Sequence, residues 1–375
     1  MNKELLYQKL GEWYEQNHRI LPWRETEDPY KIWISEIILQ QTRVAQGMEY
    51  YHRLITRFPD IQSLADAEED EVLLYWQGLG YYSRARNLHK AAQLMKNHEI
   101  FHQAMRRLGD EAIRLLGDKA KGEKEGDEAR RRKAKGEEIF AALKSMPGVG
   151  DYTAGAIASF AFDLPYPALD GNVYRVLSRL YDCEIAFDTT QGKKHFRQLA
   201  EDFLDREHPR LFNSAIMELG ALHCVPTAPD CPTCPLNTWC KALANNTVEL
   251  LPVRKPRPKV RDRYLEYTIY ITPERTTLIH QRKGNDIWKH LYEFPVQEIH
   301  SLEDAHSGYS LEVKGEKTLE LTHVLSHQKL HARFVIKNVS ELPEIPDTVV
   351  VSLSDLDNYA FSRLTLKAME TLAQR

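Results

Sequence analysis

Two spacings of apolar residues divide the chain. Through the first hundred residues, and again over 152–220, apolar side chains recur every three or four positions, which is the period of an amphipathic helix. Prolines and glycines interrupt this period and predict short connections between helices. The clearest helical runs are Leu5, Leu6, Leu10 and Trp13; Trp33, Ile34, Ile37 and Ile38; and Leu73, Leu74 and Trp76. The first two thirds of the chain is therefore predicted to be all helical.

After residue 264 the period changes to strict alternation, which is typical of strands with one buried face. Strands are predicted over 265–271, 276–280, 319–325 and 330–336. The preceding segment, PVRKPRPKVRDR over 252–263, has three prolines and six basic residues and is predicted to be an extended linker. Residues 264–375 are thus expected to form a separate α+β domain.

Composition narrows the class of protein. With 42% hydrophobic and 28% charged residues over 375 positions, the chain has the balance of a globular protein. A formal net charge of −4 excludes a uniformly basic binder of polyanions and leaves room for a local basic face. The chain lacks an apolar run of about eighteen residues, so no membrane span is expected. The first residues lack the features of a signal peptide, so a cytoplasmic location is expected.

One block stands apart in composition. Residues 117–138 read GDKAKGEKEGDEARRRKAKGEE, with eight basic and seven acidic residues. Mixed charge of this kind favours a solvated helix or a flexible insertion. A DNA-contacting arm is the alternative, because Arg130, Arg131, Arg132 and Lys133 are locally basic.

Four of the five cysteines lie close together: Cys224, Cys231, Cys234 and Cys240. Clustered thiols in a reducing compartment indicate a metal site instead of disulfides. The spacing C-x6-C-x2-C-x5-C has one short C-x-x-C pair, whereas zinc modules commonly have two. An iron–sulfur cluster is favoured, with zinc as the alternative.

A Pro-Gly-Val-Gly turn over 147–150 separates two helical stretches. Glycines at 148 and 150 allow positive φ and close approach of the backbone, and amides at a helix start favour anions. This layout is typical of a helix-hairpin-helix that holds DNA phosphates through Gly148 and Gly150. The alternative is a simple connection between helices. Downstream, Asp170 precedes Gly171 and is either a helix N-cap or a catalytic carboxylate.

Together the hairpin, the later aspartate and the cysteine spacing resemble the endonuclease III superfamily of DNA base-excision glycosylases, over about residues 1–245. Bifunctional members have a Schiff-base lysine two positions after the hairpin, where this chain has Tyr152, so lyase chemistry is not expected. The segment from Trp33 to Thr42, which contains Glu36, resembles the adenine DNA glycosylase (MutY) branch. Pro22-Trp23-Arg24 and the segment from Gly78 to Arg84 resemble it as well.

The C-terminal domain resembles the Nudix-like domain of the same branch. The stretch Leu291-Tyr292-Glu293-Phe294-Pro295 is similar to the family's W-E-F-P, with Tyr292 in place of tryptophan. The family's lesion-reading Phe-Ser-His appears as Leu325, Ser326 and His327, so any contact of the phenylalanine ring is in doubt. The alternative for His327 is a strand-end histidine without such a role. The chain lacks the Nudix hydrolase signature, so pyrophosphate hydrolysis is not expected.

The resemblance implies a multidomain protein that binds one 4Fe-4S cluster through the four clustered cysteines. It implies an iron–sulfur helical domain of 1–24 and 153–245, a six-helix domain of 25–152, a linker of 246–263 and a Nudix-like domain of 264–375. The implied partner is double-stranded DNA with adenine opposite 8-oxoguanine, bound by a monomer acting on bacterial-type chromosomal DNA.

The resemblance also implies residue roles. Glu36 would be the acid, which burial would favour by raising its pKa, although most glutamates on helices are exposed. Asp170 would stabilise the sugar cation, and Tyr152 and Asn172 would orient both groups. DNA or lesion contacts would come from Arg24, Gln41, Thr42, Leu79 and Tyr81. The alternatives are an endonuclease III-like glycosylase for oxidised pyrimidines and a non-catalytic iron–sulfur protein that binds DNA.

Overall fold

The computed structural model describes residues 2–96, 125–256, 259–302 and 317–373, with the backbone alone described over 125–133 and 372–373. The chain forms two compact units, each built from separate stretches of sequence. Unit 1 comprises Met1–Gly47, Phe58–Ala65 and Lys90–Pro256. Unit 2 comprises Met48–Arg57, Asp66–His89 and Arg257–Arg375. A segment of the helical half thus belongs with the C-terminal strands.

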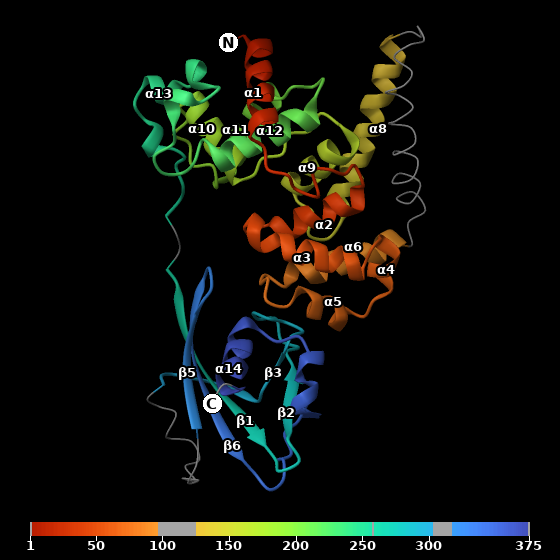
Figure 1. Ribbon diagram of the computed structural model, residues 1–375, viewed down its shortest axis with the longest axis vertical. Coiled ribbons are helices and arrows are strands. Elements are labelled where there is room, and N and C mark those ends of the chain that lie inside the picture. Colours follow the sequence, from red (N-terminus) through yellow and green to blue (C-terminus); the bar gives the residue numbers. More distant parts are fainter. Residues whose placement is uncertain (1, 97–124, 257–258, 303–316, 374–375) are drawn as a thin grey trace. The chain divides into compact units, whose positions relative to one another are not determined.

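The predicted helices and strands are present (Figure 1). The α-helices are α1 (Lys3–Asn17), α2 (Pro29–Leu39), α3 (Val44–Arg57), α4 (Ile61–Asp66), α5 (Glu69–Trp76), α6 (Ser83–Lys96), α8 (Glu125–Ser145), α9 (Asp151–Phe162), α10 (Gly171–Tyr181), α11 (Thr190–Phe203), α12 (Pro209–Leu222), α13 (Lys241–Ala244) and α14 (Arg363–Ala373). The strands are β1 (Arg261–Ile271), β2 (Thr276–Gln281), β3 (Tyr292–Glu293), β4 (Val296–Ile299), β5 (Lys317–Val324), β6 (Gln328–Asn338) and β7 (Val349–Ser352). Short 3-10 helices are η2 (Cys231–Thr233), η3 (Asn237–Trp239), η4 (Val248–Leu250) and η6 (Leu353–Asn358).

In unit 1 a layer of helices surrounds α9 and α12. Helix α2 packs against α9, and α1 and α10 pack against α12. Helix α2 begins where Asp28 caps the amides of Tyr30 and Lys31, with Pro29 at the first helical position. Most of its side chains are buried, so a glutamate on this helix is placed inside the protein.

Part of the charged block over 117–138 belongs to a helix. Residues 117–124 lie outside the described residues, but 125–138 begin α8, which continues unbroken to Ser145. Gly136 is buried, and a Cβ there would lie 3.2 Å from the Leu164 side chain. At this end the predicted solvated helix is present, with Ala134, Glu137 and Glu138 exposed, except that Gly136 is buried against Leu164.

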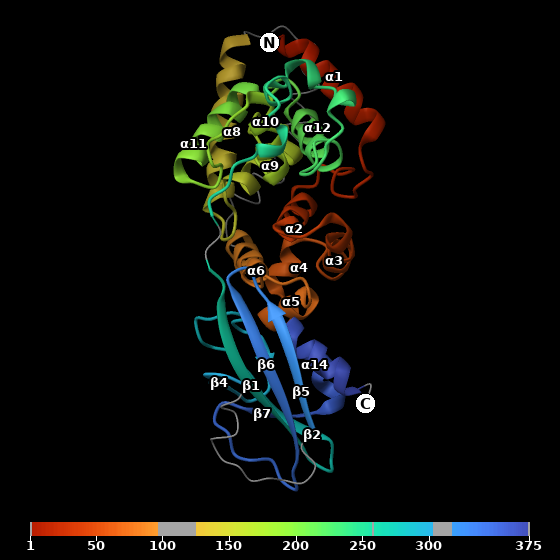
Figure 2. The ribbon, with the colours of Figure 1, turned by 90° about the vertical axis from the view of Figure 1, so that its left-hand side faces the viewer.

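Unit 2 contains two sheets, seen from a second direction in Figure 2. The four-stranded sheet has the order β4-β1-β6-β5, with β1 and β6 parallel and the other neighbours antiparallel. The three-stranded sheet has the order β3-β2-β7. Their inner faces and α14 enclose a core that includes Tyr267, Phe294, Phe334 and Phe361. Strand β1 begins at Arg261, so the last residues of the predicted linker belong to the sheet.

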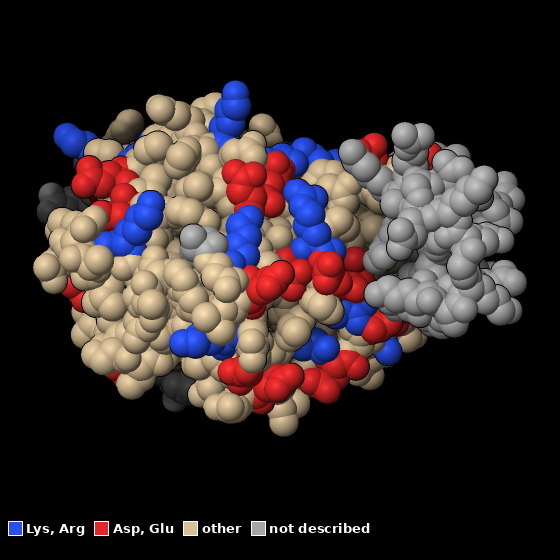
Figure 3. Space-filling view, turned by 90° about the horizontal axis from the view of Figure 1, so that it is seen from above, with Lys and Arg blue, Asp and Glu red and all other residues tan. Residues whose placement is uncertain are grey.

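Acidic and basic side chains are mixed on the end of unit 1 that Figure 3 shows. Over the described surface of this face, neither sign forms a continuous patch. The local basic face that the net charge allows is therefore not found there. Among the described helices, none has the length and apolar character needed to cross a membrane.

Candidate active site

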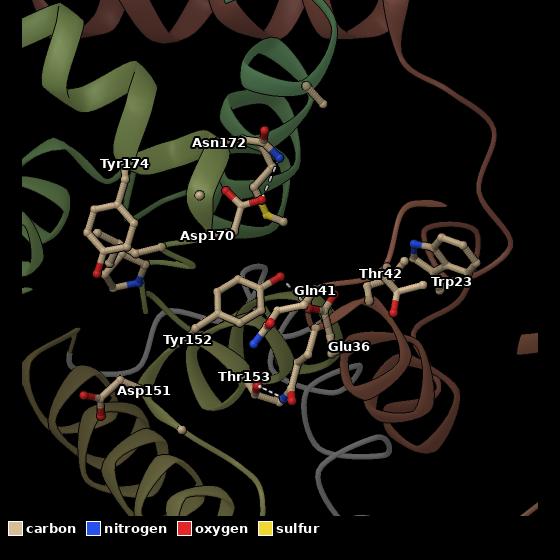
Figure 4. Close-up of a pocket in the computed structure, with 18 of the residues that line it drawn as sticks. Trp23, Glu36, Gln41, Thr42, Asp151, Tyr152, Thr153, Asp170, Asn172 and Tyr174 are labelled. Carbon is tan, nitrogen blue, oxygen red and sulfur yellow. Dashed lines mark hydrogen bonds between the residues drawn. The ribbon is translucent and has the colours of Figure 1, made fainter. Parts of the chain in front are cut away.

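A cavity of about 750 Å³ in unit 1 brings together the four predicted catalytic residues. Glu36 comes from α2, Tyr152 from α9, Asp170 precedes α10, and Asn172 lies in its first turn. Figure 4 shows Tyr152 pointing toward Glu36, with Asp170 and Asn172 together on another wall. The cavity has the size of an ordinary small-molecule site, about 300–1,000 Å³.

Glu36 is 1% exposed, so the alternative of an exposed helix glutamate is wrong. The Tyr152 hydroxyl donates a hydrogen bond of 2.6 Å to Glu36 Oε2, and Arg24 Nη1 lies 4.0 Å from Glu36 Oε1. Burial raises the pKa of Glu36, while Arg24 and the Tyr152 hydrogen bond oppose the shift and Asp170 adds to it. A neutral, proton-bearing Glu36 is thereby favoured.

Asp170 is both a helix cap and a wall of this cavity, so its two predicted roles coincide. Its Oδ1 accepts from the Val173 amide at 2.7 Å, and its Oδ2 accepts from Asn172 Nδ2 at 2.8 Å. Burial raises the pKa of Asp170, and these donors oppose that shift. Because both oxygens accept hydrogen bonds at a helix N-terminus, the ionised form is better supported here than at Glu36.

Asn172 is held from both sides. It donates to Asp170, and its Oδ1 accepts from Arg175 Nη2 at 2.8 Å. Arg175 also donates to the carbonyls of Gly220, at 2.6 Å, and of Cys224, at 2.7 Å. A Cβ on Gly220 would lie 2.7 Å from Asn172 Cβ, so only glycine permits this approach of α12 to α10. A continuous path of hydrogen bonds thus joins Asp170 to the first clustered cysteine.

The predicted hairpin lines the same cavity. Gly148 has φ +79°, which favours glycine, whereas Gly150 has φ −90° and caps α9. Gln40, at the end of α2, donates to Thr153 Oγ1 at 3.1 Å and to the Gly148 carbonyl at 3.5 Å. Gln40 therefore fastens α2 to the hairpin. Sequence reasoning missed this role, although Gln40 lies in the segment that it singled out.

Arg24, Gln41 and Thr42 also line this cavity. The Arg24 guanidinium lies over the Phe160 ring, 3.8 Å from its centroid, and its side chain is mostly buried. The structure places Arg24 beside the acid, where its positive charge lowers the pKa of Glu36. The predicted contact of Arg24 with DNA stays a prediction.

An ion pair that the sequence did not reveal completes the cavity wall. Arg19 Nε and Nη2 donate to the two carboxylate oxygens of Glu218 at 2.6 and 2.9 Å, and the Arg19 amide donates at 3.0 Å. The pair joins positions 199 apart. A carboxylate among the apolar residues of α12 is the only signal that could have drawn attention to it.

The four clustered cysteines line one small cavity together with Arg179 and His223. Arg179 Nη1 lies 3.4 Å from Cys224 Sγ and donates to the Val225 carbonyl at 2.7 Å. Burial raises the pKa of Cys234 to about 12, so a thiolate there requires nearby cations. Among the residues that the structure describes, no three His, Cys, Asp or Glu side chains are arranged to hold a metal ion.

Four of the predicted DNA- and lesion-binding residues lie in unit 2: Leu79, Tyr81, Ser326 and His327. Ser326 and His327 form the exposed tip of the turn between β5 and β6, and with Tyr81 they line a cavity of about 340 Å³. Trp288 lines it too, so the cavity keeps aromatic faces although Leu325 replaces phenylalanine. Tyr81 is 47% exposed, but Leu79 is 6% exposed. A base contact by Leu79 would require that side chain to leave its packing.

Comparisons with known proteins agree with this fold. The profile of the HhH-GPD superfamily of base excision DNA repair proteins matches residues 34–204, and that of the NUDIX domain matches 266–371. An adenine DNA glycosylase of Buchnera aphidicola subsp. Baizongia pistaciae is 33% identical over 298 residues, covering 79% of this chain and 74% of that protein. Another, of subsp. Schizaphis graminum, is 31% identical over 334 residues, covering 88% and 86%.

Among solved structures, a thermostable thymine-DNA glycosylase has the same fold over 65% of this chain and 97% of its own, with TM-score 0.50 and 22% identity. The fold and the two domain matches thus define a helix-hairpin-helix base-excision glycosylase with a Nudix-like domain. Within this class, the chain belongs to the adenine DNA glycosylase family.

Proposed function

We propose that this chain, acting as a monomer, removes adenine opposite 8-oxoguanine from double-stranded DNA by hydrolysing the N-glycosidic bond. The observation that carries the proposal is the buried Glu36 hydrogen-bonded to Tyr152, in one cavity with Asp170 and Asn172. A base inside a duplex cannot reach buried carboxyls, so the adenine must leave the stack to enter this cavity.

Glu36 acts as the acid. The Tyr152 hydroxyl donates a hydrogen bond to Glu36 Oε2, so the proton of the neutral Glu36 carboxyl is carried by Oε1. Transfer of that proton to adenine N7 makes the base a better leaving group, and the electrons of the glycosidic bond pass to the base. Water then completes the hydrolysis at the sugar and returns a proton to Glu36.

Asp170 stabilises the cationic sugar that forms when the bond breaks. Hydrogen bonds from Val173 and Asn172 keep this carboxylate in one orientation and support its negative charge. The two carboxyls lie in different environments and therefore have different roles, with Glu36 as the acid and Asp170 as the stabiliser of the sugar cation, as in retaining glycosidases.

Tyr152 cannot form an imine, so the proposed enzyme does not cleave the DNA backbone through a Schiff base. The cavity does contain one lysine wall residue, Lys193. Borohydride trapping of the wild-type chain on abasic DNA should give no covalent complex, and Lys193→Arg is the control that identifies any residual adduct.

The opposing 8-oxoguanine is read in unit 2. Ser326 and His327 present a hydroxyl and an imidazole at a turn, and Tyr81 and Trp288 supply aromatic faces in the same cavity. Polar donors beside flat rings suit a purine with an added carbonyl oxygen.

The four cysteines that line one cavity, with the Arg179 cation beside Cys224, are the donor set that a 4Fe-4S cluster takes, although the described side chains are not arranged as a ready-made metal site. Cys224, Cys231, Cys234 and Cys240 would hold the cluster, which would supply a rigid link across the loop. Purified protein should be brown, with iron and sulfide present and zinc absent.

Glu36→Gln and Asp170→Asn test the chemistry, because both substitutions preserve shape and asparagine caps a helix about as well as aspartate. Both variants should fold and bind an adenine:8-oxoguanine duplex, yet excise adenine at least about 10²-fold more slowly. Wild-type protein should act on that duplex and leave an oxidised-pyrimidine duplex intact. A Glu36→Gln variant with normal excision would refute the acid assignment.

A further inference from the structure

The loop between α5 and α6 has an unusual backbone. Gly78, Gly80 and Tyr81 have φ of +94°, +79° and +48°, in the left-handed region that a tyrosine rarely adopts. Tyr81 is the exposed residue of this loop. Such a conformation persists only where neighbouring groups hold it.

Several of these neighbours come from the same helical segments. The Gly80 carbonyl accepts from Trp76 Nε1 at 3.0 Å and from Arg84 Nη2 at 3.1 Å. The Gln77 carbonyl accepts from the Tyr50 hydroxyl at 2.8 Å. These bonds are independent of the Nudix-like domain.

Two further bonds to this loop come from a single residue of the C-terminal domain. The Phe361 amide donates to Gln77 Oε1 at 2.7 Å, and the Phe361 carbonyl accepts from the Tyr82 hydroxyl at 3.3 Å. The same hydroxyl accepts from the Gly78 amide at 3.1 Å. One residue, through its amide and its carbonyl, therefore binds the loop at both of its ends, across 284 positions of sequence in the case of Gln77.

Phe361 is fixed within the core of its own domain. Its side chain is 1% exposed and stacks on Phe294, with ring centroids 5.9 Å apart. Its backbone also pairs with Tyr292 in an isolated bridge. The loop is thus attached to the core that carries the Ser326–His327 turn, and Tyr81 lines the cavity of that turn.

We infer that Gln77 is a positioning residue for lesion discrimination: through Phe361, the C-terminal domain sets the conformation in which the loop presents Tyr81 to the base opposite adenine. This inference rests on the proposed function. The domain then contributes to discrimination in two ways, by contact at Ser326 and His327 and by holding Tyr81.

Gln77→Met and Gln77→Glu form a matched pair of tests. Methionine has a similar shape and leaves the Phe361 amide without an acceptor, whereas glutamate retains one. The measurement is the ratio of single-turnover excision rates on adenine:8-oxoguanine and adenine:guanine duplexes. Gln77→Met should lower this ratio about 5- to 30-fold, the effect expected for a lost buried hydrogen bond. Gln77→Glu should remain within about twofold of wild type.

A double-mutant cycle with Tyr81→Ala separates positioning from general stability. If Gln77 acts through Tyr81, Gln77→Met should change the ratio by less than about twofold in the Tyr81→Ala background. The inference is overturned if Gln77→Met lowers the ratio equally in both backgrounds, or if it lowers only the melting temperature. Tyr82→Phe, which removes the other bond to Phe361, replaces Gln77→Met if that variant does not fold, with the same expected result. A wild-type enzyme without preference for 8-oxoguanine would instead refute the proposed function.

Discussion

Replacing Tyr152 with phenylalanine should move the pH dependence of adenine excision toward higher pH. Glu36 must be protonated to act as an acid, so the rate falls as pH rises through its pKa. The Tyr152 hydroxyl donates to Glu36 and stabilises the carboxylate, which lowers this pKa. Tyr152→Phe removes that donor and therefore raises the pKa. A hydrogen bond to a charged group contributes about 1.5–3 kcal/mol, so on the alkaline limb the variant should keep at least about tenfold more of its own plateau rate than wild type does.

The assay is single-turnover excision from an adenine:8-oxoguanine duplex with enzyme in excess, so that product release does not contribute. Tyr174→Phe is the matched control. Tyr174 lines the same cavity, and the structure shows no hydrogen bond from its hydroxyl to either carboxyl. The alkaline limb of this control should coincide with that of wild type.

An alkaline limb that stays in place, or moves to lower pH, in a folded Tyr152→Phe protein would refute the reasoning. Either result would mean that the Tyr152 hydrogen bond does not lower the pKa of the acid on which excision depends. Loss of rate at every pH without a shift would assign Tyr152 to orientation alone.

Three further outcomes are expected. Arg175→Gln, which loses the bonds to Asn172 and to the Cys224 carbonyl, should slow excision and also lower the yield of iron-loaded protein; a change in excision with normal iron content and melting temperature would contradict the linkage. Deleting residues 117–124 and joining the ends with a short Gly/Ser link should leave adenine excision intact. Deleting residues 117–138 should instead lower the melting temperature of the protein, because α8 loses its first turns. Equal melting temperatures of the two deletion variants would show that the packing of Gly136 contributes nothing to stability. Ser326→Ala with His327→Ala should weaken the preference for 8-oxoguanine over guanine by about 1–3 kcal/mol per lost base contact, and equal loss on both duplexes would assign the turn to folding.

The sequence predicted those parts of the site that lie in short motifs. The Asp170 cap, the Gly148 turn and the four cysteines each follow from local spacing, and their residues lie as expected. The role of Glu36 came from the resemblance of residues 33–42 to the family, and its apolar neighbours indicated the burial that the structure shows. Each of these features is set by neighbouring residues or by helix periodicity, so a single sequence contains the signal.

Pairs that depend on tertiary packing could not be predicted. The Arg19–Glu218 pair and the bond from Phe361 to Gln77 join residues far apart in sequence, and neither has a periodic or local pattern. The division of the chain into two units could not be predicted either, because the sequence of residues 66–89 has the same helical pattern as the rest of the N-terminal half. Packing across the chain, which local propensity does not specify, decides where they belong.

Because Asp170 both caps α10 and is the proposed stabiliser of the sugar cation, different substitutions at this position should differ in genetic dominance. Most substitutions there would remove the cap along with the charge, and the unstable product would be degraded in the cell. Asparagine is different, because it retains the bond to Val173 and so gives a stable protein that still recognises its lesion. Such a protein would occupy mismatches without repairing them and would shield them from the normal enzyme. The asparagine allele should therefore be dominant, raising the mutation rate of cells that also carry a wild-type copy, whereas unstable alleles should be recessive.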